Sequence, residues 1–270
     1  MLVFDLRKEL KTKAKLHDID TADVDFIMAE VLNVKRTELS ILGDVDADSE
    51  IKIREAFALR LEGKPVDKIF GKAYFYGLEF VVDENVLTPR PETELLVEIA
   101  VKEIENNNYK TVLDLCTGSG CIAVAIAKNT NAEITASDIS TKALKIAKQN
   151  AKNNNVNINF VKSNMFSEID GKFDLIVSNP PYIATEDIED LDEEVKNHDP
   201  RLALDGGYLG LKYYNIIHEN LRKKLNENGT LIMEIGDEQR DLIMSMFTDF
   251  RLVKCIKDLS GNDRIIIVKN

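Results

Sequence analysis

Cysteine and histidine are scarce in this sequence, and their scarcity excludes two kinds of stabilising site. The chain has three cysteines, Cys116, Cys121 and Cys255, and three histidines, none of them at the paired spacing of a structural zinc site. We therefore predict neither a disulfide framework nor a bound metal.

Long apolar runs and positive charge are also lacking. No segment is apolar over the length that a membrane span or a signal peptide requires, and residues 1–8 already carry several charges. The net charge is −12, so no overall positive field attracts a phosphate backbone. These absences predict a cytoplasmic protein that binds no membrane and does not bind nucleic acids stably.

The apolar pattern divides the chain into two domains and a linker. Helical spacing of apolar residues predicts a small helical domain over residues 1–70, with Thr21 and Thr37 as helix N-caps. The first of its helices has three apolar residues on one face: Phe4, Leu6 and Leu10. Two aromatic runs on either side of Gly77 predict a β-hairpin within a linker over 71–88.

Strand and helix patterns alternate over the remaining residues, 89–270. Strand patterns fall on the segments 112–115, 133–137, 158–161, 174–177, 230–235 and 264–268. Helical patterns fall on the segments from about 88 to 105, 121–128, 142–152, 213–225 and 238–247. This alternation predicts an α/β fold with a mostly parallel sheet, helices on both faces, and ligands bound at the carboxyl ends of the strands.

The most informative segment is Ser178-Asn179-Pro180-Pro181-Tyr182, which follows a strand pattern. The two prolines fix their own φ angles and restrict the residue before each, so the loop is expected to be rigid. It would present the Asn179 side-chain oxygen and the Pro180 carbonyl as two fixed acceptors, with the Tyr182 ring as a stacking face. This set suits an amide or an exocyclic amine, although Asn-Pro alone is common in ordinary turns.

A second motif, Asp114-Leu115-Cys116-Thr117-Gly118-Ser119-Gly120, joins the first strand of the α/β domain to a helix. Its glycines allow close approach of a ligand to the backbone, and the start of a helix favours a negative group. Asp138 follows the next strand, where a carboxylate can accept both hydroxyls of a ribose. Together these features predict a nucleoside-containing cofactor.

Two cofactors fit this pattern. The glycine spacing and Asp138 also satisfy a dinucleotide fingerprint, which would indicate an oxidoreductase. S-adenosylmethionine is favoured by three further positions: Asp114 for the cofactor's amine, Asn164 and Met165 for its adenine, and Asn179 to close the pocket. Each residue alone has a structural alternative, since Asp138 could simply cap the helix that begins near Thr141.

Five segments resemble the bacterial protein-(glutamine-N5) methyltransferases that modify peptide chain release factors: 87–94, 114–120, 179–183, 199–207 and 234–236. The Asn-Pro-Pro-Tyr loop is shared with N6-adenine DNA methyltransferases. The Arg90-Pro-Glu-Thr-Glu94 and Asp199-Pro-Arg-Leu-Ala-Leu204 segments resemble the glutamine family in particular.

The resemblance implies a seven-stranded, Rossmann-like methyltransferase sheet that follows a helical domain for substrate docking. It also implies S-adenosylmethionine as methyl donor and the glutamine of the Gly-Gly-Gln motif of class I release factors as acceptor. We predict Asn179 and Pro180 as catalytic residues, with Pro181 and Tyr182 completing the substrate site. The predicted cofactor site comprises Asp114, Cys116, Thr117, Gly118, Ser119, Gly120, Asp138, Asn164, Met165 and Asn179.

Two residues depart from the family pattern. Cys116 stands where many relatives have glycine, so this position is expected not to require a positive φ. Asn164 stands where aspartate is common, which removes a charge beside the adenine. Two other functions remain open: an N6-adenine methyltransferase acting on DNA or RNA, which the acidic charge disfavours, and a non-catalytic cofactor-binding module, which the intact Asn-Pro-Pro-Tyr loop disfavours.

Overall fold

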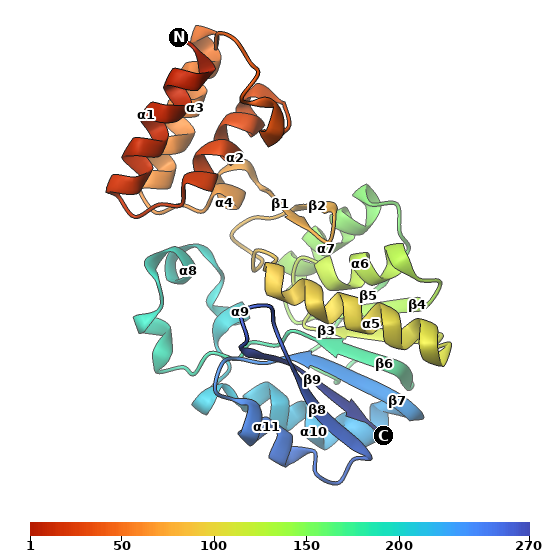
Figure 1. The fold of residues 1–270 in the computed structure, drawn as a ribbon. Coiled ribbons are helices and arrows are strands. Elements are labelled where there is room, and N and C mark those ends of the chain that lie inside the picture. The colour runs from red at the N-terminus through yellow and green to blue at the C-terminus, as the bar shows by residue number, and fades with distance from the viewer. The chain divides into compact units, whose positions relative to one another are not determined.

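The computed structural model describes residues 1–270 and divides them into two compact units (Figure 1). One unit is helical and contains residues 1–71 together with residues 193–198. The other is an α/β unit of residues 72–192 and 199–270. None of the helices is both long and apolar enough to cross a membrane.

The helical unit packs four helices from the start of the chain around one apolar core: α1 (Val3–Leu16), α2 (Thr21–Leu32), α3 (Ala47–Leu61) and α4 (Val66–Phe70). On α1 the buried face carries Val3, Leu6 and Leu10, whereas Phe4 is 63% exposed. The prediction that Phe4 lies on the apolar face was wrong, because spacings of three and four residues place Val3, not Phe4, in line with Leu6 and Leu10.

Both predicted N-caps of this unit were wrong. Asp20 caps α2, with its side chain accepting from the Ala22 backbone N–H, and Thr21 is already the first helical residue. Thr37 lies inside a short 3-10 turn, Arg36–Glu38. Threonine and aspartate are both good N-caps. The N-cap is the last non-helical residue before a helix, and before α2 this residue is Asp20.

A distant segment completes the helical unit. The short helix α8 (Glu193–His198) belongs to this unit although it lies far along the chain. Arg60 contacts both parts, with Nε 2.6 Å from an Asp23 carboxylate oxygen and Nη2 2.8 Å from a Glu194 carboxylate oxygen. These ion pairs connect α8 to helices α2 and α3.

The α/β unit contains one seven-stranded sheet with the strand order β5-β4-β3-β6-β7-β9-β8. Its strands are β3 (Thr111–Leu115), β4 (Glu133–Asp138), β5 (Asn159–Lys162), β6 (Phe173–Ser178), β7 (Leu225–Glu234), β8 (Leu252–Lys257) and β9 (Asp263–Lys269). The first five are parallel, and β9 runs antiparallel to both β7 and β8. The predicted α/β fold with a seven-stranded, mostly parallel sheet is confirmed.

The sequence patterns missed β8. It is an edge strand in which Leu252, Lys254 and Lys257 are exposed and the other three residues are half-buried, so it lacks the buried apolar run of a central strand. The final strand β9 lies between β7 and β8 and is buried over Ile265–Val268. Its continuous apolar run made it predictable from the sequence.

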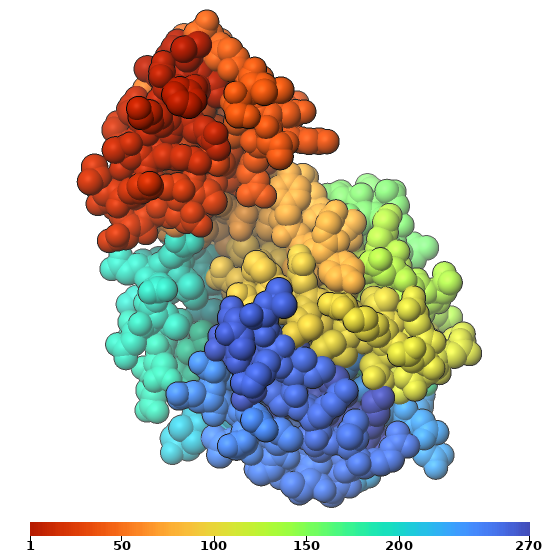
Figure 2. All heavy atoms as spheres, viewed as in Figure 1, coloured from red at the N-terminus to blue at the C-terminus, as the bar shows by residue number.

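Helices cover both faces of the sheet (Figure 1). One face packs against α5 (Glu94–Asn107), α6 (Cys121–Asn129) and α7 (Thr141–Asn153), and the other against α10 (Lys212–Lys224) and α11 (Arg240–Met246). Figure 2 shows the yellow atoms of α5 beside blue atoms of the C-terminal part of the chain. Lys269 of β9 pairs with Glu103 of α5 at 2.6 Å.

The remaining elements of the α/β unit are short. They are the hairpin β1 (Lys72–Phe75) and β2 (Leu78–Val81), the helix α9 (Arg201–Leu204), and the 3-10 turns η2 (Pro91–Thr93), η3 (Asp187–Asp190) and η4 (Tyr208–Gly210). Asn150 fixes the hairpin, because its side chain exchanges two hydrogen bonds with the backbone of Val81. Pro91 occupies the first turn before α5, where a missing N–H is harmless.

Candidate active site

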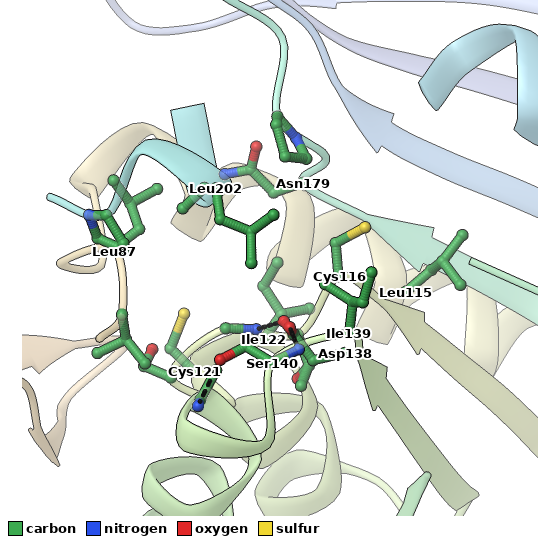
Figure 3. A pocket seen from close by; sticks show the side chains of 18 of the residues that line it. Leu87, Leu115, Cys116, Cys121, Ile122, Asp138, Ile139, Ser140, Asn179 and Leu202 are labelled. Carbon is green, nitrogen blue, oxygen red and sulfur yellow. Dashed lines mark hydrogen bonds between the residues drawn. The ribbon is translucent and has the colours of Figure 1, made fainter. Parts of the chain in front are cut away.

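A pocket opens at the carboxyl ends of the central parallel strands, as the alternating pattern predicted. Nine of the predicted site residues line it: Cys116, Thr117, Gly118, Ser119, Asp138, Asn164, Met165, Asn179 and Pro181. Figure 3 shows Asn179 on one side of the pocket and Asp138 with Ser140 on the opposite side. The other four predicted residues, Asp114, Gly120, Pro180 and Tyr182, are not part of the lining.

The turn from β3 into α6 has left-handed backbone at alternate residues. The φ angles are 64° at Cys116, 54° at Gly118 and 81° at Gly120. The expectation for Cys116 was therefore wrong: the turn requires a positive φ there whatever the residue, at a strain of about 1 kcal/mol for a side chain other than glycine. Gly120 has a second constraint, since an added Cβ would lie 2.9 Å from the Ala147 Cβ of α7.

Asp138 connects this turn to the next one. One of its carboxylate oxygens accepts from the Gly118 N–H at 2.9 Å, and the other accepts from the Ser140 N–H at 2.8 Å. Burial raises the pKa of this carboxyl. The cap of α7 is Ser140, whose Oγ accepts from the Ala143 N–H, so the alternative role of Asp138 as the helix cap is wrong.

Asp114 lies beneath the turn and is fully buried. One carboxylate oxygen accepts from the Thr117 hydroxyl at 2.5 Å, while the other has no hydrogen-bond partner. Burial raises the pKa of Asp114 to about 7. Its contact is with the loop, so binding of a cofactor amine by Asp114 stays a prediction.

The loop after β5 forms another part of the wall. Met165 has a φ of 51°, and its sulfur lies 3.7 Å from the Cys116 sulfur. The Ser163 hydroxyl donates to the Met165 carbonyl at 2.6 Å, which fixes the loop. Asn164 is exposed at this position and lines the pocket.

The Asn-Pro-Pro-Tyr loop starts where β6 ends. Ser178 anchors it by donating from Oγ to the Leu115 carbonyl at 2.8 Å. The Tyr182 carbonyl accepts from the Gln239 side-chain amide at 2.9 Å, and burial raises the pKa of the Tyr182 hydroxyl to about 12. The Tyr182 ring packs beside Gly236, where an added Cβ would lie 3.0 Å from the ring. Stacking of this ring on a substrate stays a prediction.

Two other motif segments hold this loop in place. The Ile183 N–H donates to the Leu204 carbonyl, and the Ile183 carbonyl accepts from the Gly206 N–H at 2.8 Å. Asp199 lies at the start of the same segment and accepts from the Arg90 guanidinium at 2.8 Å. The segments 87–94 and 199–207 are therefore brought together around the Asn-Pro-Pro-Tyr loop.

The donors and acceptors of the pocket fit a nucleoside cofactor. The lining combines apolar side chains such as Leu115, Ile122 and Ile139 with the Asp138 carboxylate. Thr88 lines this pocket, and its hydroxyl is buried without a hydrogen-bond partner. An added Cβ at Gly118 would meet no atom within 4 Å, which leaves space beside the backbone.

Known proteins with similar sequences share one activity. A chain from Agrobacterium fabrum named release factor glutamine methyltransferase is 40% identical over 90% of this chain and 88% of its own. One of the same name from Streptococcus pneumoniae is 38% identical over 92% and 91%, respectively. This chain belongs to the release factor glutamine methyltransferase family. The profile of the Methyltransferase small domain matches residues 91–211.

Solved structures support the fold of this family member. The hMettl16 catalytic domain, solved with an RNA hairpin, superposes with a TM-score of 0.58 at 16% identity and covers 84% of each chain. A methyltransferase from Pyrococcus furiosus gives a TM-score of 0.55 at 21% identity over 78% of this chain and 96% of its own. The predictions of a methyltransferase and of S-adenosylmethionine as its cofactor are confirmed.

Two residues beside Asn179 were not predicted as site residues. The Asn179 side-chain nitrogen lies 3.3 Å from the Thr93 hydroxyl, which lies 2.7 Å from a carboxylate oxygen of Glu234. Burial raises the pKa of Glu234. A signal was present in the sequence, because Glu234 is an ionisable residue at the end of an otherwise apolar strand pattern.

Proposed function

We propose that this chain transfers the methyl group of S-adenosylmethionine to the side-chain amide nitrogen of the glutamine in the Gly-Gly-Gln motif of class I release factors. The observation that carries the proposal is that Asn179 lines the same pocket as the glycine turn and Asp138. The names of the relatives support the same substrate. Because release factors act in translation, the proposed site of action is the cytoplasm.

A glutamine amide is a poor nucleophile because its nitrogen lone pair is delocalised into the carbonyl. When bound, S-adenosylmethionine would supply a methyl group on a positively charged sulfur; the new N–C bond would replace the S–C bond, and the proton lost by the amide would pass to solvent. In the proposal, the Asn179 side-chain oxygen and the Pro180 carbonyl accept the two amide hydrogens and fix the nitrogen. Such positioning can contribute about 7–11 kcal/mol, and acceptors arranged in advance stabilise the charge that develops on nitrogen.

The other proposed roles follow the architecture. Asp138, with the backbone of residues 116–120, would hold the ribose and the neighbouring part of the cofactor, and Asn164 with Met165 would contact its adenine. Pro181 and Tyr182 would complete the substrate site. The helical unit, with its own core, would dock the release factor.

The test is methyl transfer from labelled S-adenosylmethionine to purified release factor, followed by mass spectrometry of the Gly-Gly-Gln peptide. We expect one added methyl group on the glutamine, and none on a release factor with that glutamine replaced. Duplex DNA and structured RNA serve as competing substrates in parallel reactions. Label on adenine with an unmodified release factor would overturn the proposal.

A further inference from the structure

The orientation of the Asn179 carboxamide decides what it can do. One end of an asparagine side chain accepts hydrogen bonds and the other donates them, and the two ends have nearly the same shape. The proposed function requires the oxygen to face the substrate amide. A side chain free to rotate by half a turn would present its NH2 group instead, and this group would repel the amide hydrogens.

The structure provides a partner for the nitrogen end. The Asn179 Nδ2 lies 3.3 Å from Thr93 Oγ1, and Thr93 Oγ1 lies 2.7 Å from Glu234 Oε2. Thr93 and Glu234 are each only 2% exposed, so bulk water does not replace these contacts. The three residues come from the loop after β6, the turn η2 and the end of β7.

The chemistry of the chain Glu234–Thr93–Asn179 gives it a direction. The Thr93 hydroxyl donates its single hydrogen to Glu234 Oε2 at 2.7 Å. Only lone pairs of Thr93 Oγ1 then remain for Asn179, which must present its NH2 group. The Asn179 oxygen is consequently directed away from Thr93.

Burial raises the pKa of Glu234, and neighbouring charges act on it in both directions. Arg264 interacts favourably with the Glu234 charge and opposes the effect of burial, while Glu92 acts in the opposite sense. Arg264 also donates to the backbone carbonyl of Ile235 at 3.3 Å. The buried Tyr214 hydroxyl donates to the Glu234 backbone carbonyl at 2.9 Å, which fixes the end of β7.

We propose that Thr93 and Glu234 are positioning residues that orient the Asn179 carboxamide with its oxygen toward the methyl-accepting amide. The proposal rests on the proposed function for the identity of that amide. Neither residue is assigned contact with the substrate. Thr93 also lines the pocket, so the double variant with Asn179→Ala decides whether its effect passes through Asn179.

The first experiment compares Thr93→Val with Thr93→Ser. Valine keeps the shape and removes the hydroxyl, so kcat should fall about 10- to 100-fold, with the affinity for S-adenosylmethionine and the KM for release factor within about twofold. Serine restores the hydroxyl and should recover most of kcat. The matched control is Thr230→Val, a buried threonine on the same strand as Glu234 whose hydroxyl contacts Tyr109 at 2.9 Å, and its kcat should not change.

A double variant tests whether the effect passes through Asn179. If it does, Thr93→Val should cause no further loss of kcat when added to Asn179→Ala, because the residue that it orients is already absent.

Glu234→Gln provides a second test of the positioning role if Thr93→Val does not fold. A glutamine both donates and accepts, so the direction is lost and kcat should fall roughly 3- to 10-fold. Wild-type kcat in both Thr93→Val and Glu234→Gln would refute the positioning role.

A spectroscopic measurement separates this inference from the proposed function. The side-chain NH2 signals of Asn179, assigned by their absence in Asn179→Ala, should exchange with solvent at least about tenfold faster in Thr93→Val than in the wild type. This measurement needs no substrate. Slower exchange of the Asn179 NH2 group in the wild type than in Thr93→Val would support the inferred orientation even if the release factor were not methylated. Equal exchange rates in the two proteins would overturn the inferred orientation.

Discussion

The two walls of the pocket are built by different physical means. The turn after β3 is shaped by its backbone, with positive φ angles at Cys116, Gly118 and Gly120. The loop after β6 is held by side chains that come from distant parts of the chain, such as Thr93 and Gln239. The backbone wall is sensitive to any added side chain that its positive φ angles or close contacts do not admit, whereas the side-chain wall is sensitive to the loss of a hydrogen-bond donor or acceptor.

The largest effect is expected on the side-chain wall. Asn179→Ala should lower the rate of methyl transfer by roughly 10³-fold, because it removes one of the two proposed acceptors of the amide hydrogens. Unfolding free energy should change little, and calorimetry should give an affinity for S-adenosylmethionine within about threefold of the wild type. A variant that methylates release factor at the wild-type rate would end the proposed role of Asn179.

The backbone wall should respond to the smallest added side chain. Gly120→Ala places a Cβ at a φ of 81° and 2.9 Å from the Ala147 Cβ, so we expect a loss of about 2–4 kcal/mol in urea unfolding.

Gly171→Ala is the matched control, with a φ of 77° and no atom within 4 Å of the added Cβ. It should lose only about 1 kcal/mol, from backbone strain. Equal losses at both positions would show that the contact between α6 and α7 does not constrain the turn.

An intermediate effect is expected at Asp138, whose carboxylate belongs to both the turn and the pocket. Asp138→Ala should weaken the binding of S-adenosylmethionine about tenfold or more, with kcat at saturating cofactor reduced far less than in Asn179→Ala. Unchanged affinity by calorimetry would mean that the ribose lies elsewhere.

The smallest effect concerns the support beneath the turn. Asp114 has a folded-state pKa raised to about 7, above the ordinary value near 3.8, so its ionisation lowers stability as pH rises between these two values. Asp114→Asn removes this titration and keeps an acceptor for Thr117. Its stability relative to the wild type should therefore increase by about 1 kcal/mol from pH 6 to pH 7. A difference independent of pH would contradict the raised pKa.

The contacts that sequence patterns predicted are mostly local. Asp138 follows directly from a strand and lies beside the glycine turn because neighbouring parallel strands end together. The left-handed Cys116 escaped prediction, because its conformation is imposed by the turn rather than by its own side chain. The edge strand β8 escaped because half-exposed residues leave a weak apolar pattern.

Residue order along the chain was enough to indicate the α/β sheet, the glycine turn and the proline-stiffened loop, because strand periodicity, φ preferences and proline geometry act over a few residues. Folding alone brought Thr93 to Glu234 across 141 positions, and Arg90 to Asp199 across 109. No local preference encodes such pairs. They form because the packed sheet and its helices bring the carboxyl ends of separate strands together, and burial then favours hydrogen bonds between the polar groups there.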